Sequence, residues 1–128
     1  MVNEAIHSHH APAPIGPYSQ AILAGDELFC SGQIPLDPAS GEIVGSEARA
    51  QARQALANLQ AVLTAANFSA ADVVKTTIYL IDIEDFSAVN AEYEKVFEAS
   101  KPARSTVAVA ALPRGARVEI DAIAKRRR

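Results

Sequence analysis

Residues 73–81 (VVKTTIYLI) restrict the fold most, because they are almost all β-branched or apolar and contain neither glycine nor proline. Such a run predicts a strand inside a sheet, covered on both faces. Helical patterns lie on either side of it. In residues 46–66 leucines recur every three or four positions, and apolar residues repeat similarly between Asp85, a candidate N-cap, and Lys101. We therefore predict a sheet packed against two helices, with Asn67 closing the first helix in a left-handed conformation.

The remaining strands come in two pairs. Residues 20–23 and 28–31 are short apolar runs separated by a Gly-Asp turn, which is typical of a hairpin. Residues 103–110 and 117–124 alternate in character and are joined by a turn that contains proline and glycine. The predicted order is β, β, α, β, α, β, β, with room for an extra strand at the N-terminus, in one α+β domain of 128 residues.

The two helices are expected to cover one face of this sheet, which leaves the other face without a helix. By alternation along the last two strands, Arg104 and Glu119 are predicted to lie together on that helix-free face. Ala108 and Ala110 are placed there too, and such small side chains gain little from contact with water. We therefore expect the helix-free face to meet another subunit.

The composition limits the classes of function. The formal net charge is -3, with acids and bases mixed along the chain, so no basic field is available to attract nucleic acid. The basic run at residues 125–128 is interpreted as a solvated tail. Cys30 is the only cysteine and cannot form an internal disulfide, and neither a signal peptide nor an apolar run of membrane-spanning length is present. We expect a cytoplasmic protein without membrane contacts.

Arg104 is the strongest candidate for a ligand anchor. Its guanidinium carries a permanent charge and a planar set of donors that matches a carboxylate. From spacing alone, a surface arginine paired with a neighbouring acid is the simpler interpretation. Glu119 is the natural partner, and it has two interpretations of its own. It forms a structural ion pair, or it orients a water molecule that attacks an electrophilic carbon.

The other candidate groups are hydroxyls, histidines and a thiol. Tyr18 and Ser31 lie beside glycine and proline, at positions that suit either turns or the presentation of polar groups to a ligand. The three histidines within residues 7–10 lack the accompanying pattern of a metal site, so we expect no bound metal. Cys30 lies in an apolar run, which favours an inert buried thiol over a nucleophile. Motifs for nucleotide, zinc and serine-hydrolase chemistry are absent from the sequence, and no cofactor is expected.

Several segments, in order and over nearly the whole chain, match the pattern of a known family. They are APAPIGPYSQA at 11–21, CSGQIPLDPASGE at 30–42, ALANLQAVL at 55–63, VVKTTIYLID at 73–82, PARSTV at 102–107 and LPRGARVEIDAIA at 112–124. On these segments the chain resembles the RidA (YjgF-type) family of reactive-intermediate deaminases.

The resemblance implies a chorismate-mutase-like α+β fold, with two helices on one face of a mixed sheet and a barrel-like homotrimer whose active sites lie between subunits. It assigns two catalytic residues: Arg104 binds the substrate carboxylate and Glu119 positions the attacking water. Family positions that line the substrate pocket are matched by Tyr18, Ser31, Gly32 and Thr106. Many relatives have cysteine in place of Thr106, so thiol-dependent properties do not carry over. Asn90 matches an asparagine of the second helix and is expected to be structural.

The implied reaction is hydrolysis of 2-imino acids and their enamines, such as 2-iminopropanoate and 2-iminobutanoate, to 2-oxoacids and ammonia, which protects pyridoxal-phosphate enzymes. These compounds hydrolyse spontaneously, so positioning the substrate and a water molecule supplies enough catalysis. Two alternatives stay open. One is a regulator that binds a 2-oxoacid or a similar small carboxylate without turnover. The other is the ribonuclease or translation-inhibitor activity attributed to relatives, which the acidic balance and the lack of a basic, aromatic platform disfavour.

Overall fold

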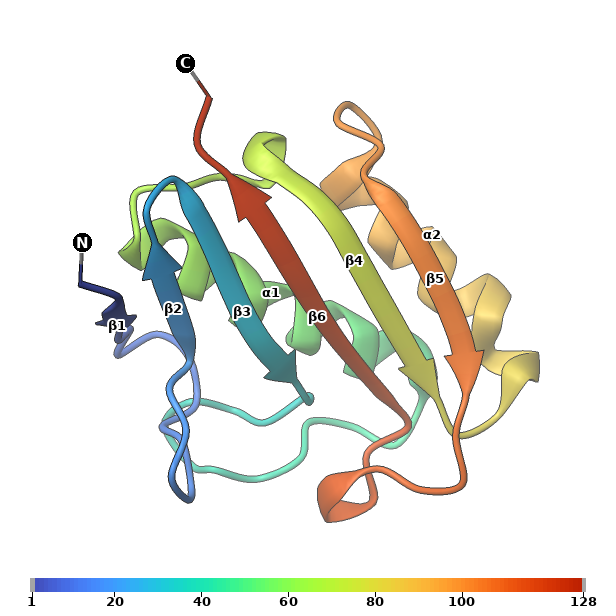
Figure 1. The fold of residues 1–128 in the computed structure, drawn as a ribbon. Helices are drawn as coiled ribbons and strands as arrows, with labels where there is room; N and C mark the ends of the chain where they lie inside the picture. Colours follow the sequence, from blue (N-terminus) through green and yellow to red (C-terminus); the bar gives the residue numbers. More distant parts are fainter. Residues whose placement is uncertain (1, 128) are drawn as a thin grey trace.

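Six strands form one mixed sheet in the order β1-β2-β3-β6-β4-β5 (Figure 1). The structure, a computed structural model, describes residues 2–127. The strands are β1 (Glu4–Ile6), β2 (Ala21–Ala24), β3 (Glu27–Gln33), β4 (Val73–Leu80), β5 (Ala103–Ala108) and β6 (Val118–Lys125). All neighbours are antiparallel except β4 and β5, which are parallel. The predicted order of elements is confirmed, and the extra N-terminal strand is β1.

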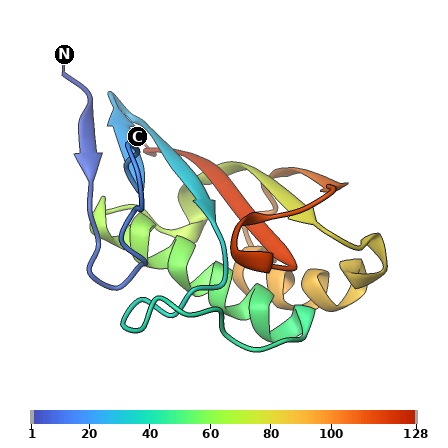
Figure 2. The same ribbon diagram turned by 90° about the horizontal axis from the view of Figure 1, so that it is seen from below.

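Two helices, α1 (Ala48–Ala65) and α2 (Phe86–Phe97), cover one face of the sheet (Figure 2). Short 3-10 helices precede β4, α2 and β6, at Ala70–Asp72, Ile83–Asp85 and Pro113–Gly115. Asn67 follows α1 with a φ of 63°, which confirms the predicted left-handed residue. The α+β fold with two helices on one face is therefore as predicted.

Asp85 lies at the start of α2, as predicted, but its side chain does not cap the helix as an N-cap residue would. Asp82 caps the short 3-10 helix before α2, because its Oδ1 accepts a hydrogen bond from the backbone N–H of Glu84 at 3.0 Å. The carboxylate of Asp85 accepts from Nη2 of Arg117 at 2.8 Å instead, so it ties α2 to the start of β6.

Alternation along β4 and β6 separates the two faces of the sheet. The large apolar side chains that are fully buried and pack beneath the helices are Ile78, Leu80, Val118 and Ile120. On the helix-free face Tyr79, Glu119 and Asp121 are partly exposed, and Tyr79 Oη donates to Asp121 Oδ2 at 2.9 Å. The strand at residues 73–80 is thus internal, as predicted, but within this chain only one of its faces is covered.

Glu92 of α2 joins the two helices through charge. Its side chain, 3% exposed, accepts hydrogen bonds from Arg49 at 3.3 Å and Arg53 at 3.1 Å on α1, and from Lys95 at 3.1 Å. The bonds from Arg53 and Lys95 lower the pKa of Glu92 to about 2 from an ordinary value of 4.5. A lowered folded-state pKa stabilises the fold above the ordinary value, and this stabilisation is lost as the pH falls through about 2.

We therefore expect Glu92→Gln to lower the free energy of unfolding near neutral pH. The three cations are more than half exposed, so solvent screening limits the effect to about 1–2 kcal/mol. Urea unfolding of both proteins, at neutral pH and near pH 2, measures it. The difference should close at the lower pH, where wild-type Glu92 becomes neutral too. A difference that does not change with pH would show that the charge of Glu92 contributes nothing.

Candidate functional site

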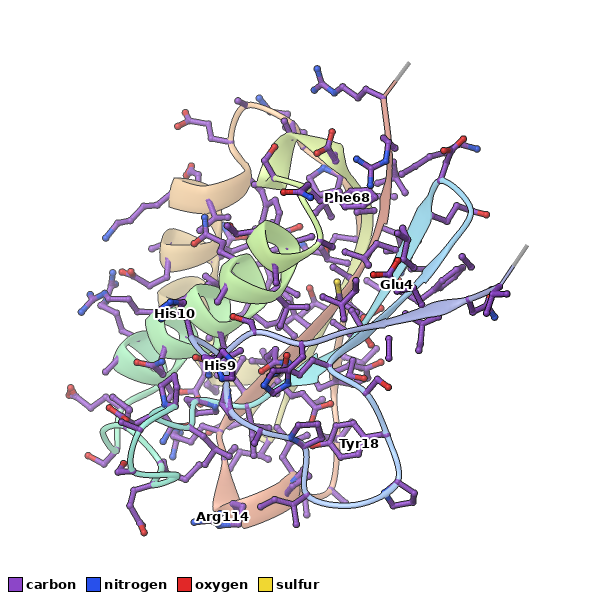
Figure 3. The ribbon with its side chains drawn as sticks, turned by 90° about the vertical axis from the view of Figure 1, so that its left-hand side faces the viewer. Glu4, His9, His10, Tyr18, Phe68 and Arg114 are labelled. Atoms are coloured by element: carbon purple, nitrogen blue, oxygen red, sulfur yellow. The ribbon has the colours of Figure 1, made fainter. Side chains whose placement is uncertain are left out.

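The site residues predicted from the sequence fall into two separate pockets, except Thr106, which lines neither. The first pocket, which we call the glutamate pocket, has a volume of about 490 Å³. Four of the predicted residues line it: Tyr18, Ser31, Gly32 and Glu119. The rest of its wall is mainly apolar and includes Ile15, Ile34, Leu36 and Pro113, together with Arg114. Tyr18 and Arg114 lie at the lower end of the molecule in Figure 3.

Hydrogen bonds hold the loop that carries Tyr18 against the sheet. The buried amide of Gln20 accepts from Ser8 N at 2.6 Å and donates to Ser8 O at 3.1 Å and Pro12 O at 2.9 Å. Ser31 Oγ donates to Ser19 O at 2.6 Å. The Ser31 proton is therefore already used, and this hydroxyl offers a ligand only its oxygen lone pairs. Sequence reasoning missed Gln20, whose role depends on contacts far along the chain.

The carboxylate of Glu119 lies against the backbone of Gly32. The register of β3 on β6 shifts between Cys30 and Gln33, which is a β-bulge, a feature common beside active sites. Burial raises the pKa of Glu119, and the negative charge of Asp121 raises it further. No group within residues 2–127 donates a hydrogen bond to this carboxylate or pairs with it. It is thus free to accept a proton from water or from a ligand.

Arg104 lies in a second pocket of about 460 Å³, the arginine pocket, between α2 and the start of β5. Its Nη1 donates to Asn90 Oδ1 at 2.7 Å. Its guanidinium carbon is 4.8 Å from the ring centre of Tyr93 and 5.4 Å from that of Phe86. Stacking and one hydrogen bond orient the guanidinium and leave its other donors available to a carboxylate.

The three residues of α2 that orient Arg104 carry a sequence signal. Phe86, Asn90 and Tyr93 are spaced by four and three residues, which puts them on one face of a helix. Asn90 was expected to be structural, but it bonds directly to the candidate anchor. The two aromatic residues were predicted only as part of the apolar stripe of the helix.

The prediction that Arg104 and Glu119 share the helix-free face is wrong. Arg104 pairs with Thr76 across the parallel strands β4 and β5, and Thr76 Oγ1 is 2.7 Å from Tyr93 Oη of α2. Arg104 is therefore on the helix side, whereas Glu119 is on the opposite face. The reason is that β5 is an edge strand exposed on both sides, so its valines do not mark the core. Val107, which the alternation placed toward the helices, is 42% exposed on the helix-free face.

Three further candidates lie outside both pockets. Thr106 Oγ1 is buried and has no hydrogen-bond partner within residues 2–127. Cys30 is buried as predicted, and burial raises the pKa of its thiol to about 12, so it is not a thiolate nucleophile. The rings of His7 and His9 pack edge to face at 4.8 Å. The described part of the chain contains no cluster of three or more potential metal ligands. None of its helices is long and apolar enough to span a membrane.

Comparisons with known proteins agree over almost the whole chain. The family model described as Endoribonuclease L-PSP matches residues 8–126. A RutC family protein of Pyrococcus horikoshii is 51% identical over 96% of this chain and 98% of its own. The 2-iminobutanoate/2-iminopropanoate deaminase of Capra hircus is 50% identical over 97% of this chain and 90% of its own.

Solved structures show the same fold. The E. coli YjgF gene product is 46% identical, with a TM-score of 0.91 over 97% of this chain and 99% of that one. E. coli TdcF with bound serine is 40% identical, with a TM-score of 0.92 over the same shares. Sequence motifs, fold and relatives therefore agree: the chain belongs to the RidA family, also called YjgF or RutC.

Proposed function

We propose that this protein hydrolyses 2-imino acids to 2-oxoacids and ammonia in the cytoplasm. The observation that carries the proposal is a pair of complementary half-sites: the unpartnered carboxylate of Glu119 and the oriented guanidinium of Arg104. Relatives from Capra hircus, Bos taurus and Homo sapiens, at 45–50% identity, are named 2-iminobutanoate/2-iminopropanoate deaminases. Serine, the ligand of E. coli TdcF, shares with these substrates a carboxylate next to a carbon that bears nitrogen.

The two half-sites are proposed to meet between subunits. Arg104 and Glu119 lie on opposite faces of the sheet, in different pockets. A small substrate that contacts both therefore needs them from neighbouring chains, as in the expected homotrimer. Phe29 and Val107, 44% and 42% exposed, face away from the helices and would gain from burial against such a neighbour.

In this proposal Arg104 holds the substrate carboxylate and Glu119 takes a proton from the water that attacks C2. The electron pair of the C=N bond moves to nitrogen, which is protonated, and a carbinolamine forms. The amino group then takes up a second proton and leaves as ammonia with the electrons of the C–N bond, while the hydroxyl group gives its proton to Glu119 and becomes the carbonyl. Both protons of the water thus end on nitrogen by way of Glu119. A carboxylate with a raised pKa is a better proton acceptor near neutral pH than an ordinary one.

Replacing Glu119 distinguishes an enzyme from a protein that only binds the substrate. The assay measures 2-oxoacid released from 2-iminopropanoate, which an amino-acid oxidase generates in situ. We expect wild type to accelerate release and Glu119→Gln to lose about 10²–10⁴-fold in kcat. The wild-type rate should also fall as the pH drops through the raised pKa of Glu119, because only the carboxylate accepts a proton.

Binding of pyruvate, measured by calorimetry, separates the deaminase from a non-catalytic regulator. A wild-type protein that binds pyruvate but does not accelerate imine hydrolysis would overturn the deaminase and support the regulator. A ribonuclease has less support from the geometry. Glu94 and Glu98 balance the charge of Lys101 and Arg104 in the arginine pocket, which does not favour a phosphate backbone.

A further inference from the structure

Gly32 occupies a position where any side chain would collide with Glu119. A Cβ added to Gly32 would overlap Glu119 Oε2 and would lie 2.8 Å from its Cδ and 3.1 Å from its Cγ. The backbone itself does not call for glycine, because Gly32 is not among the residues with positive φ. A side chain at position 32 therefore fits only if the Glu119 carboxylate, the movable end of its side chain, leaves this position. A glycine inside a strand often marks such a close approach.

The missing side chain determines how Glu119 is placed. Its carboxylate fills the volume that a side chain at position 32 would take, inside the bulge of β3. One side of the carboxylate is thus covered by backbone, while both residues line the glutamate pocket. Loss of water disfavours the charged form, and Asp121 adds negative charge, which together account for the raised pKa of Glu119.

We propose that Gly32 is a positioning residue for Glu119, its absent side chain forming the seat that holds the carboxylate at the glutamate pocket. The catalytic meaning of this seat rests on the proposed deaminase function. It differs from the role expected from the sequence, in which Gly32 is part of the wall that contacts the substrate. Here Gly32 acts through Glu119.

A double-mutant cycle tests the seat in the coupled imine assay. We expect Gly32→Ala to lower kcat by about 10–100-fold, because the displaced carboxylate no longer holds the water. Glu119→Ala should lower kcat at least as much, and adding Gly32→Ala to it should cost nothing more. A side chain at position 32 meets no obstacle once the carboxylate is gone. If the fold-losses in kcat of the two single variants multiply in the double variant, Gly32 acts independently of Glu119 and the proposal is overturned.

Thermal unfolding covers the case in which Gly32→Ala does not fold. If the collision with Glu119 is the cause, Gly32→Ala/Glu119→Ala folds and regains the Tm of Glu119→Ala. A double variant that stays unfolded, or that keeps the full loss of Tm, means that another contact requires glycine.

A titration of the Glu119 carboxyl by ¹³C NMR tests the positioning of Glu119 by Gly32 independently of the proposed deaminase activity. In Gly32→Ala the displaced carboxylate regains water, so its pKa should fall toward the ordinary value for glutamate. If the pKa of Glu119 is unchanged in Gly32→Ala, the proposal that Gly32 positions Glu119 is overturned. If wild type does not accelerate imine hydrolysis but Gly32→Ala still lowers the pKa of Glu119, only the deaminase function is overturned.

Discussion

Arg104→Ala is expected to reduce kcat/KM for 2-iminopropanoate by two to three orders of magnitude. Truncating one partner of a hydrogen-bonded charge pair costs about 3–4 kcal/mol, and the substrate carboxylate loses two parallel hydrogen bonds. Arg104→Lys should recover only part of this loss. Lysine keeps the charge, but it lacks the planar fork and the stacking on Tyr93 and Phe86. The measurement is 2-oxoacid release as a function of substrate concentration.

Asn90→Ala is the matched control for this experiment, because it removes the 2.7 Å hydrogen bond and leaves the charge in place. We expect a loss of about 5–10-fold, mainly through KM, because this hydrogen bond is solvent-exposed and contributes about 1 kcal/mol. Wild-type kcat/KM in Arg104→Ala would contradict the assignment. The next cation to test would then be Arg114, which lines the glutamate pocket.

Mixing inactive variants tests whether the half-sites come from different subunits. Arg104→Ala and Glu119→Gln are unfolded together in equal amounts and refolded. In a cyclic homotrimer with shared sites, about one site in four then receives an intact Arg104 and an intact Glu119. Activity should return to about a quarter of that of wild type treated in the same way. No recovery in refolded, assembled protein would contradict a site shared between subunits.

The largest expected effect on stability comes from Asn58→Ala. Asn58 is fully buried in α1, where its Nδ2 donates to Ile34 O at 3.1 Å and Leu36 O at 2.9 Å. Alanine leaves both carbonyl groups without this partner and opens a small cavity. We expect the free energy of unfolding to fall by about 3–4 kcal/mol, measured by urea denaturation. KM should rise as well, because Ile34 and Leu36 form part of the glutamate pocket.

Gln54→Ala serves as the control for Asn58→Ala. Gln54 donates to Asn58 Oδ1 at 2.8 Å, but it is only partly buried, so water can replace this bond. Its loss should cost no more than about 1 kcal/mol. Similar losses for both variants would mean that the two carbonyl groups of the loop find other partners, and that Asn58 does not hold this wall of the pocket.

Helices and strands could be predicted from the sequence wherever one side of the element is buried and the other is exposed. The leucines of α1 and the alternating residues of β6 repeat with the period of their own structure, because one side of each element packs in the core. Asn67 and the hairpin turn could be predicted because few residues suit a left-handed backbone. The prediction failed for β5. An edge strand exposed on both sides has no buried face for its pattern to report, so Arg104 was assigned to the wrong side.

By itself, the sequence determined the order of helices and strands, the family, and the candidacy of Arg104, Glu119, Tyr18, Ser31 and Gly32, because local periodicity and short motifs carry that information. Only the tertiary structure decided how these residues are arranged. The register of β5 on β4 turned Arg104 toward α2, and the bulge in β3 brought Gly32 under the carboxylate of Glu119. Both depend on contacts between segments distant in sequence, where the position of one strand on another determines which way a side chain points.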